Sequence, residues 1–277
     1  HLHWDHFHGD SLKKLFDPEI HILVPKVPTR RMLTDLNYLG FHNVTEIPHS
    51  SSIQLADDFS LTSYQGGIGV DSAVVLSSKK TTLFNANDCK VFGLPLKQII
   101  QRFPKIDFVF KSHSSATAIP DCIEGYDEIF SEHRTKSDYI EEFCRFALSI
   151  GARYAIPFAS NHCFLHRETM QYNNKAVRPR DVKDRFQRES SLMDMDSECV
   201  VMVPGSHWCE NEGFQLEEFD FADSESYIIA LRKKYERKLN LQYKKEDETQ
   251  ANFESFNDYF DSFLKAIPWP IKKLLNP

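Results

Sequence analysis

Several features that would assign this sequence to a narrow class are missing. Its six cysteines form no C-x-x-C pair, which argues against a zinc ribbon and a small disulfide framework. No apolar run approaches the roughly 20 residues that span a bilayer, and no secretory hydrophobic segment is present. We therefore expect reduced thiols and a cytoplasmic location.

The charge balance disfavours another class. Acidic residues outnumber basic ones by 40 to 33, and the formal net charge of −7 argues against a nucleic-acid-binding face over the whole surface. With 277 residues, 41% of them apolar, the chain can bury a sizeable core. This composition fits one large α/β domain as well as two smaller domains.

The sequence does contain a dense group of metal-binding side chains in residues 1–10, HLHWDHFHGD. The spacing H-x-H-x-D-H covers His1, His3, Asp5 and His6. Side chains two residues apart in an extended segment point the same way, so His1 and His3 can bind one ion. Asp5 and His6 complete that site or serve a second ion, and mixed nitrogen and oxygen ligands favour zinc, iron or manganese. The alternative, a purification-tag remnant, does not explain the aspartate.

The segment HLHWDHF resembles the signature of the metallo-β-lactamase-fold superfamily. Similarity continues through residues 22–41, 85–89 and 152–159, and it is closest to the branch with the metallo-β-lactamase-like domain of CMP-N-acetylneuraminate hydroxylase and its bacterial relatives. The resemblance covers about residues 1–205. It implies an α/β fold of the αββα sandwich type at residues 1–215, followed by a helical extension at 216–277. Several strands precede the metal motif in that fold, so we expect a fragment that lacks its N-terminal strands.

Asp88 is the next candidate ligand. It follows an apolar strand, where a carboxylate is costly unless it is paired or coordinated, and the resemblance implies that it completes or bridges the metal site. The alternative is a turn that caps the next helix. The predicted metal ligands are His1, His3, Asp5, His6, Asp88 and His162, and Asp5 is also the predicted catalytic residue.

Two histidines that are usual in the superfamily are missing. Residues 65–71, QGGIGVD, replace the one expected before the strand at 72–77, and Pro157 stands where a later strand usually ends in histidine. His162 could substitute from the following loop. The hydroxylase-like branch shares these departures, which weaken a di-zinc site and argue against hydrolysis of a lactam.

Short β-rich segments separated by turn residues predict an antiparallel meander over residues 52–86. Helices then alternate with strands, which indicates a sheet covered by helices. The helix at 138–150 is predicted to begin with a capping box of Asp138 and Glu141, and a strand is expected at 199–203.

The last part of the chain predicts a basic helix to residue 239, a charged linker at 244–250 and then an aromatic stripe at helical spacing. The stripe comprises Phe253, Phe256, Phe260, Phe263 and Leu264. Such a stripe is more often core than surface, although it could pack on a missing C-terminal domain or a partner.

Loops after two predicted strands hold further candidates. His113 and His166 could approach the metal ligands together with His162, since loops at one edge of a sheet converge. Lys111, Arg153 or Arg167 could receive an anionic small-molecule substrate.

The leading functional hypothesis is a metal-dependent hydrolase of phosphoester or acyl substrates. Bound zinc, or iron or manganese, would lower the pKa of a water molecule, and Asp5 would orient that water or act as general base. The second hypothesis is an iron-dependent oxygenase component related to the sialic-acid hydroxylase. That enzyme uses a Rieske cluster, which needs a C-x-H and a C-x-x-H motif, and this chain does not contain both. Electrons would then come from a missing segment or a redox partner. The third hypothesis is a metal-depleted binding module.

Overall fold

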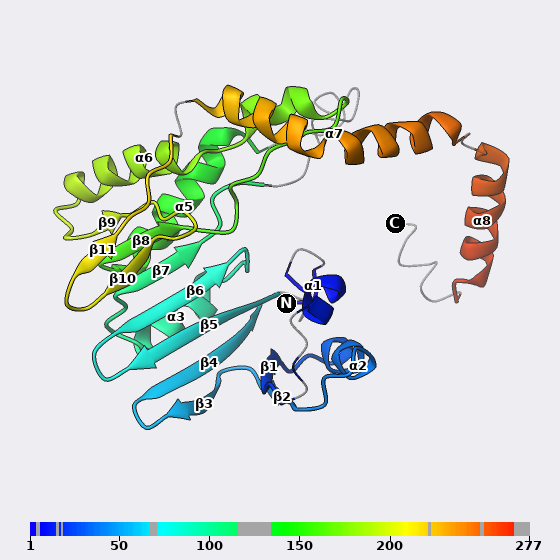
Figure 1. The fold of residues 1–277 in the computed structure, drawn as a ribbon. Helices are drawn as coiled ribbons and strands as arrows, with labels where there is room; N and C mark the ends of the chain where they lie inside the picture. The colour runs from blue at the N-terminus through cyan, green and yellow to red at the C-terminus, as the bar shows by residue number, and fades with distance from the viewer. Residues whose placement is uncertain are drawn as a thin grey trace. The chain divides into compact units, whose positions relative to one another are not determined.

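The computed structural model describes residues 1–3, 6–14, 17, 19–66, 71–115, 134–220, 223–249 and 252–268. The chain divides into two compact units, His1–Ser224 and Glu225–Pro277. The first unit combines helices with a seven-stranded mixed sheet (Figure 1). The α/β fold class predicted from the sequence is confirmed.

The main sheet has the strand order β3-β4-β5-β6-β7-β8-β9. Its first four strands form the predicted antiparallel meander, and β6 to β9 are parallel neighbours. The strands are β3 (Ser51–Ala56), β4 (Phe59–Gly66), β5 (Asp71–Ser78), β6 (Thr82–Asn87), β7 (Phe108–Lys111), β8 (Tyr154–Pro157) and β9 (Glu198–Cys199).

The last strand is shorter than the sequence suggested. The prediction of a strand at 199–203 was wrong in extent, because β9 ends at Cys199. The backbone N–H of Val200 still donates to the carbonyl of Ala155 at 3.0 Å. The next rung would need an N–H at position 157, and Pro157 has none.

Three helices cover one face of this sheet: α3 (Gly93–Arg102), α5 (Lys136–Ile150) and α6 (Pro179–Leu192) (Figure 1). Their apolar side chains share one buried cluster with inward-facing residues of β5 to β8. Phe143 of α5 and Phe186 of α6 are fully buried in it, as is Phe84 of β6. Because β6 to β9 run parallel, their carboxyl ends lie at one edge of the sheet.

The N-terminus of α5 differs from the prediction. The capping box consists of Thr135 and Asp138, not of Asp138 and Glu141. The Thr135 hydroxyl accepts from the N–H of Asp138 at 3.3 Å, and the Asp138 carboxylate accepts from the N–H of Thr135 at 2.6 Å. The sequence assignment was displaced because the helix begins two residues earlier, at Lys136, which makes Asp138 the third residue of the helix rather than its cap.

A hairpin of β10 (His207–Cys209) and β11 (Gly213–Gln215) lies at the amino ends of the parallel strands. Trp208 packs edge-on against Phe108 at a ring distance of 4.8 Å, and Phe214 packs against Tyr154 at 4.9 Å. Phe108 and Tyr154 are the first residues of β7 and β8. The hairpin therefore occupies the edge opposite to the carboxyl ends of these strands.

A smaller lobe precedes the sheet. It contains α1 (Gly9–Lys14), β1 (Ile22–Pro25), α2 (Arg31–Tyr38) and β2 (Val44–Ile47), and β1 pairs with β2 in parallel. A second core cluster of Val24, Met32, Leu36 and Phe41 holds it together. A short 3-10 helix, η1 (Met170–Lys175), leads into α6.

The second unit contains α7 and α8 (Phe253–Ala266). α7 begins at Ser224 and continues to Glu248, so the predicted linker at 244–250 was wrong over most of its length. Its charges lie at helical spacing, as with Lys244 and Glu248 at 3.8 Å, and support the helix instead of ending it.

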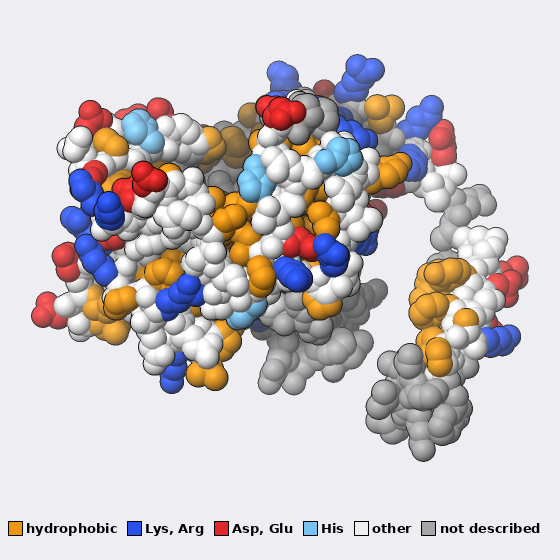
Figure 2. All heavy atoms as spheres, turned by 90° about the horizontal axis from the view of Figure 1, so that it is seen from below, with side chains coloured by type: hydrophobic (Ala, Val, Ile, Leu, Met, Phe, Trp, Pro, Cys, Tyr) orange, Lys and Arg blue, Asp and Glu red, His pale blue; other side chains and the backbone are white. Residues whose placement is uncertain are grey.

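The aromatic stripe on α8 is exposed, which contradicts the assignment to a core. Phe256, Phe260, Phe263 and Leu264 are 42–56% exposed, and Figure 2 shows a continuous apolar strip on one side of this helix. Within the described part of the chain, no helix is both long and apolar enough to cross a membrane.

Candidate metal centre

The first histidines lie on a turn that is anchored by apolar neighbours. The backbone N–H groups of His6 and Phe7 donate to the carbonyl of His3 at 2.9 and 2.7 Å. Leu2 and Phe7 pack against the second core cluster. The His1 side chain is fully buried, that of His6 is 23% exposed and that of His3 is 52% exposed. The predicted catalytic residue, Asp5, lies outside the described residues.

Two carboxylates reach this turn from the sheet. Asp71 is the first residue of β5, and Asp88 directly follows β6; the two strands are antiparallel, so both residues lie at one edge. The Asn87 side chain joins them. Its Oδ1 accepts from the N–H of Asp88 at 2.7 Å and of Cys89 at 3.1 Å, and its Nδ2 donates to the carbonyl of Ser72 at 2.9 Å.

The histidines and the carboxylates face one another at short range. His1 Nε2 lies 3.5 Å from Asp88 Oδ1, His6 Nε2 lies 3.4 Å from Asp88 Oδ2, and His3 Nδ1 lies 3.8 Å from Asp71 Oδ1. The rings of His1 and His6 are 3.9 Å apart between centroids. Two groups of ligand atoms result, each within 4.8 Å: His1, His3 and Asp71, and His1, His6 and Asp88.

These groups have the chemistry and spacing of a transition-metal site. Asp71 Oδ1 and Asp88 Oδ1 are buried and accept no hydrogen bond from any described residue, an arrangement that is costly without a cation. Two atoms that are each about 2.1 Å from a tetrahedral ion lie roughly 3.4 Å apart, which is close to the observed nitrogen–oxygen separations. Imidazole and carboxylate together suit zinc, iron or manganese. The residues present therefore fit a bound metal.

Asp71 is the ligand candidate that the sequence argument missed. Residues 65–71 were expected to supply a histidine, and the acid that begins β5 has a different side chain. The available signal was a carboxylate at the edge of an apolar strand, the same signal that singled out Asp88.

The remaining histidine candidates lie elsewhere on the same edge. His162 belongs to neither ligand group within the described residues. Its Nδ1 lies 3.0 Å from the Ser160 carbonyl, which makes Nδ1 the protonated nitrogen. Its buried Nε2 receives no hydrogen bond from the described residues. His113 is 2% exposed, and neither of its ring nitrogens has a hydrogen-bond partner among the residues that the structure describes. His166 Nδ1 accepts from the N–H of Glu168 at 3.3 Å.

Two of the basic residues suggested for an anionic substrate are badly placed for that role. Lys111 is 1% exposed and its ammonium lies 3.9 Å from Glu142, so it is a buried partner of that carboxylate. Burial lowers the pKa of Lys111, and the nearby Glu142 opposes that shift. Arg153 immediately precedes β8 and thus lies at the amino ends of the parallel strands, away from Asp88.

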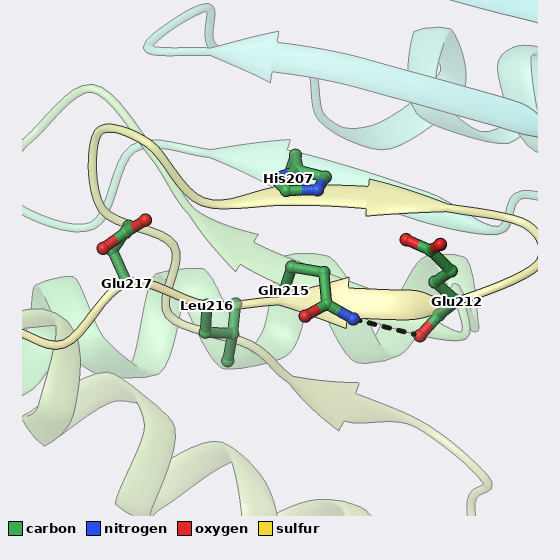
Figure 3. Close-up of a pocket in the computed structure, with 5 residues that line it drawn as sticks. All are labelled: His207, Glu212, Gln215, Leu216 and Glu217. Carbon is green, nitrogen blue, oxygen red and sulfur yellow. Dashed lines mark hydrogen bonds between the residues drawn. The ribbon is translucent and has the colours of Figure 1, made fainter.

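An open groove of about 580 Å³ occurs on the β10–β11 hairpin (Figure 3). It is lined by His207, Glu212, Gln215, Leu216 and Glu217. Because the hairpin packs at the amino ends of β7 and β8, this groove and the candidate metal centre lie at opposite edges of the sheet.

Comparison with protein-family models gives no match. The chain is 29% identical over 222 residues to a protein of Mycolicibacterium smegmatis described as a candidate Rieske 2Fe-2S iron-sulfur protein, and 26% identical over 223 residues to one of Mycobacterium tuberculosis with the same description. Each alignment covers 74% of this chain and 42% of the relative, so the chain spans about two fifths of their length.

Among solved structures, the chain is similar to CmlA, a diiron β-hydroxylase from Streptomyces venezuelae. The sequence identity is 13% and the TM-score is 0.46, with 73% of this chain and 42% of CmlA covered.

Proposed function

We propose that this chain is the iron-binding part of an oxygenase that receives its electrons from a Rieske-type segment or partner. The observation that carries the proposal is the pair of ligand groups that share His1, with three imidazoles and two carboxylates at one edge of the sheet. The similarity to relatives described as candidate Rieske 2Fe-2S proteins supports iron over zinc. The metallo-β-lactamase-like signature in residues 1–7 supports the same placement of ligands.

The residues of the chain would divide the work as follows. His1 and His3 with Asp71, or His1 and His6 with Asp88, would hold an ion, with Asp5 and His162 as further ligands. Iron bound there would supply the redox chemistry for activating dioxygen. Asp88 has one oxygen near His1 and the other near His6, so its carboxylate would be a ligand of the ion held with these two histidines. Asn87 keeps that carboxylate at the edge of the sheet, because it accepts from the Asp88 N–H.

The electron source belongs outside the described site. A C-x-x-H spacing occurs once, from Cys163 to His166, but no C-x-H motif is present in the 277 residues. We propose that residues 1–215 form the catalytic domain, that residues 216–277 form an extension, and that the protein works in the reducing cytoplasm on a small-molecule substrate. The five described cysteines are free thiols.

A hydrolase remains the second candidate, because the same nitrogen and oxygen ligands would hold zinc. Zinc held there would supply an activated water for hydrolysis, and Asp5 would orient that water. The metal identity separates the two.

The test is elemental analysis of the whole chain, purified after growth with iron and zinc both available. We expect iron without acid-labile sulfide in the wild type and loss of at least one equivalent in His3→Ala and in Asp88→Ala. His207→Ala, on the exposed hairpin, is the control and should keep full metal. Stoichiometric zinc with little iron would favour the hydrolase. Full metal in both site variants would show that the site assignment is wrong.

A further inference from the structure

Lys111 is a fully buried cation at the carboxyl end of β7. Its side chain is 1% exposed, and the ammonium lies 5.6 Å from the centre of the Phe146 ring and 6.0 Å from that of Phe92. A methionine would fill the same space at no cost in charge burial, whereas a buried ammonium is expensive. The stability of the fold alone does not account for a charged side chain at this position.

The ammonium is held directly behind the turn that carries Asp88. Lys111 Nζ donates to the carbonyl of Cys89 at 3.4 Å. Lys111 is also paired across the sheet with Asn87, and the N–H of Ser112 donates to the Asn87 carbonyl at 2.6 Å. The Lys111 side chain thus contacts Cys89, the residue after Asp88, while the backbone of the next residue, Ser112, binds Asn87, the residue before it.

Among the described residues, the carboxylate paired with this ammonium is Glu142 of α5, at 3.9 Å. Glu142 is itself paired with Arg134, whose guanidinium lies 2.5 Å away and also covers the Tyr139 ring. Other titratable groups of the described residues also act on the pKa of Lys111: Cys89 and Asp88 favour the ammonium, and Lys90 disfavours it. Glu142 is thus shared between two cations and neutralises Lys111 only in part. The remaining positive charge of Lys111 acts on the turn that carries Asp88.

We propose that Lys111 is a positioning residue. Its positive charge, held behind the turn that carries Asp88, makes the electrostatic potential at the metal centre more positive, and Glu142 partly neutralises that charge. This inference rests on the proposed function, since it needs an ion at Asp88. A fixed positive charge near a divalent ion weakens the binding of that ion and favours the reduced state of iron, because both effects follow from the same Coulomb repulsion.

The test compares two substitutions that change this charge in opposite directions. Lys111→Met removes the cation at nearly constant volume, so it should bind Fe²⁺ or the probe Co²⁺ about tenfold more tightly and lower the midpoint potential of bound iron. Glu142→Gln removes the opposing carboxylate, so it should weaken binding by a similar factor and raise the potential. Lys90→Met makes the same chemical change at an exposed neighbour, where solvent screens the charge, and should alter affinity less than about twofold.

The sign of the change distinguishes a charge effect from a packing effect. If Lys111 only supports the fold, Lys111→Met and Glu142→Gln will weaken metal binding together, or neither will alter it, and either result overturns the inference. Circular dichroism and the unfolding midpoint verify that both variants fold; should Lys111→Met fail to fold, Lys111→Gln in the same comparison decides. Absence of metal from the wild type would overturn the proposed function as well. Metal that is present in the wild type and lost in Asp88→Ala leaves that function standing, whatever Lys111 does.

Discussion

His113 is a histidine whose burial lowers the stability of the folded state. It is 2% exposed, neither ring nitrogen has a hydrogen-bond partner in the described part of the chain, and burial lowers its pKa to about 4 from an ordinary 6.5. The neighbouring His162 acts in the same direction, and its own pKa is also lowered by burial. Both imidazoles are therefore held neutral in the native protein.

This shift predicts acid sensitivity. Between pH 6.5 and pH 4 the unfolded chain binds a proton at His113 that the native chain does not. The contribution of His113 to the free energy of unfolding is therefore complete above pH 6.5 and falls toward pH 4, by at most about 3.4 kcal/mol. His113→Leu should flatten this part of the curve of unfolding free energy against pH, measured with urea at several pH values. His207→Ala should leave the slope unchanged. An unchanged slope in His113→Leu would show that other groups cause the acid loss.

Single residues also show how far the sequence could predict the site. His1, His3, His6 and Asp88 were selected by residue type and spacing, and the structure brings all four within a few ångströms; their role as ligands stays a prediction. Asp71 was not selected, because its position depends on the pairing of β5 with β6 and its type differs from the expected histidine. His162 was selected from a loop whose path the sequence does not determine, and it belongs to neither described group.

At the scale of elements, α5 shows how a helix boundary is set by a side chain. Its first turn is closed by the Thr135 and Asp138 pair, and its last by Gly151 in the left-handed region at φ +69°. Because the Thr135 hydroxyl satisfies the N–H of Asp138, Thr135→Ala should lower the free energy of unfolding by about 1 kcal/mol. Chemical denaturation measures this. Ser137→Ala, an exposed change in the same turn, is the matched control and should have almost no effect, and equal losses in both variants would contradict the capping role.

The sequence predicted helices and strands well where the apolar residues recur at a regular spacing. The meander of β3 to β6 alternates and is broken by clear turns, so its strands were placed well. Helix α6 was missed because its composition is highly polar and its buried side chains, Val182, Phe186 and Ser190, form a narrow stripe that includes a serine. The β10–β11 hairpin was missed because each strand has three residues, too few to show a period.

At the scale of the whole molecule, the two units differ in how they use apolar side chains. The first unit has two buried clusters, whereas the described part of α8 exposes its aromatic stripe. Replacing Phe256 and Phe260 by serine should therefore change the free energy of unfolding of the first unit by less than about 0.5 kcal/mol and leave its metal content unaltered. Thermal unfolding with elemental analysis measures both. A large loss of stability would mean that the stripe is buried in the folded protein.

All three imidazoles of the candidate centre lie in the first six residues, while both carboxylates belong to the rim of the sheet. An ion between them would tie the histidine-bearing segment to the rim of the sheet. Emptying the centre with a chelator would then do more than stop chemistry: it would release that segment and expose its peptide bonds to proteolysis, so that metal supply would govern the lifetime of the protein.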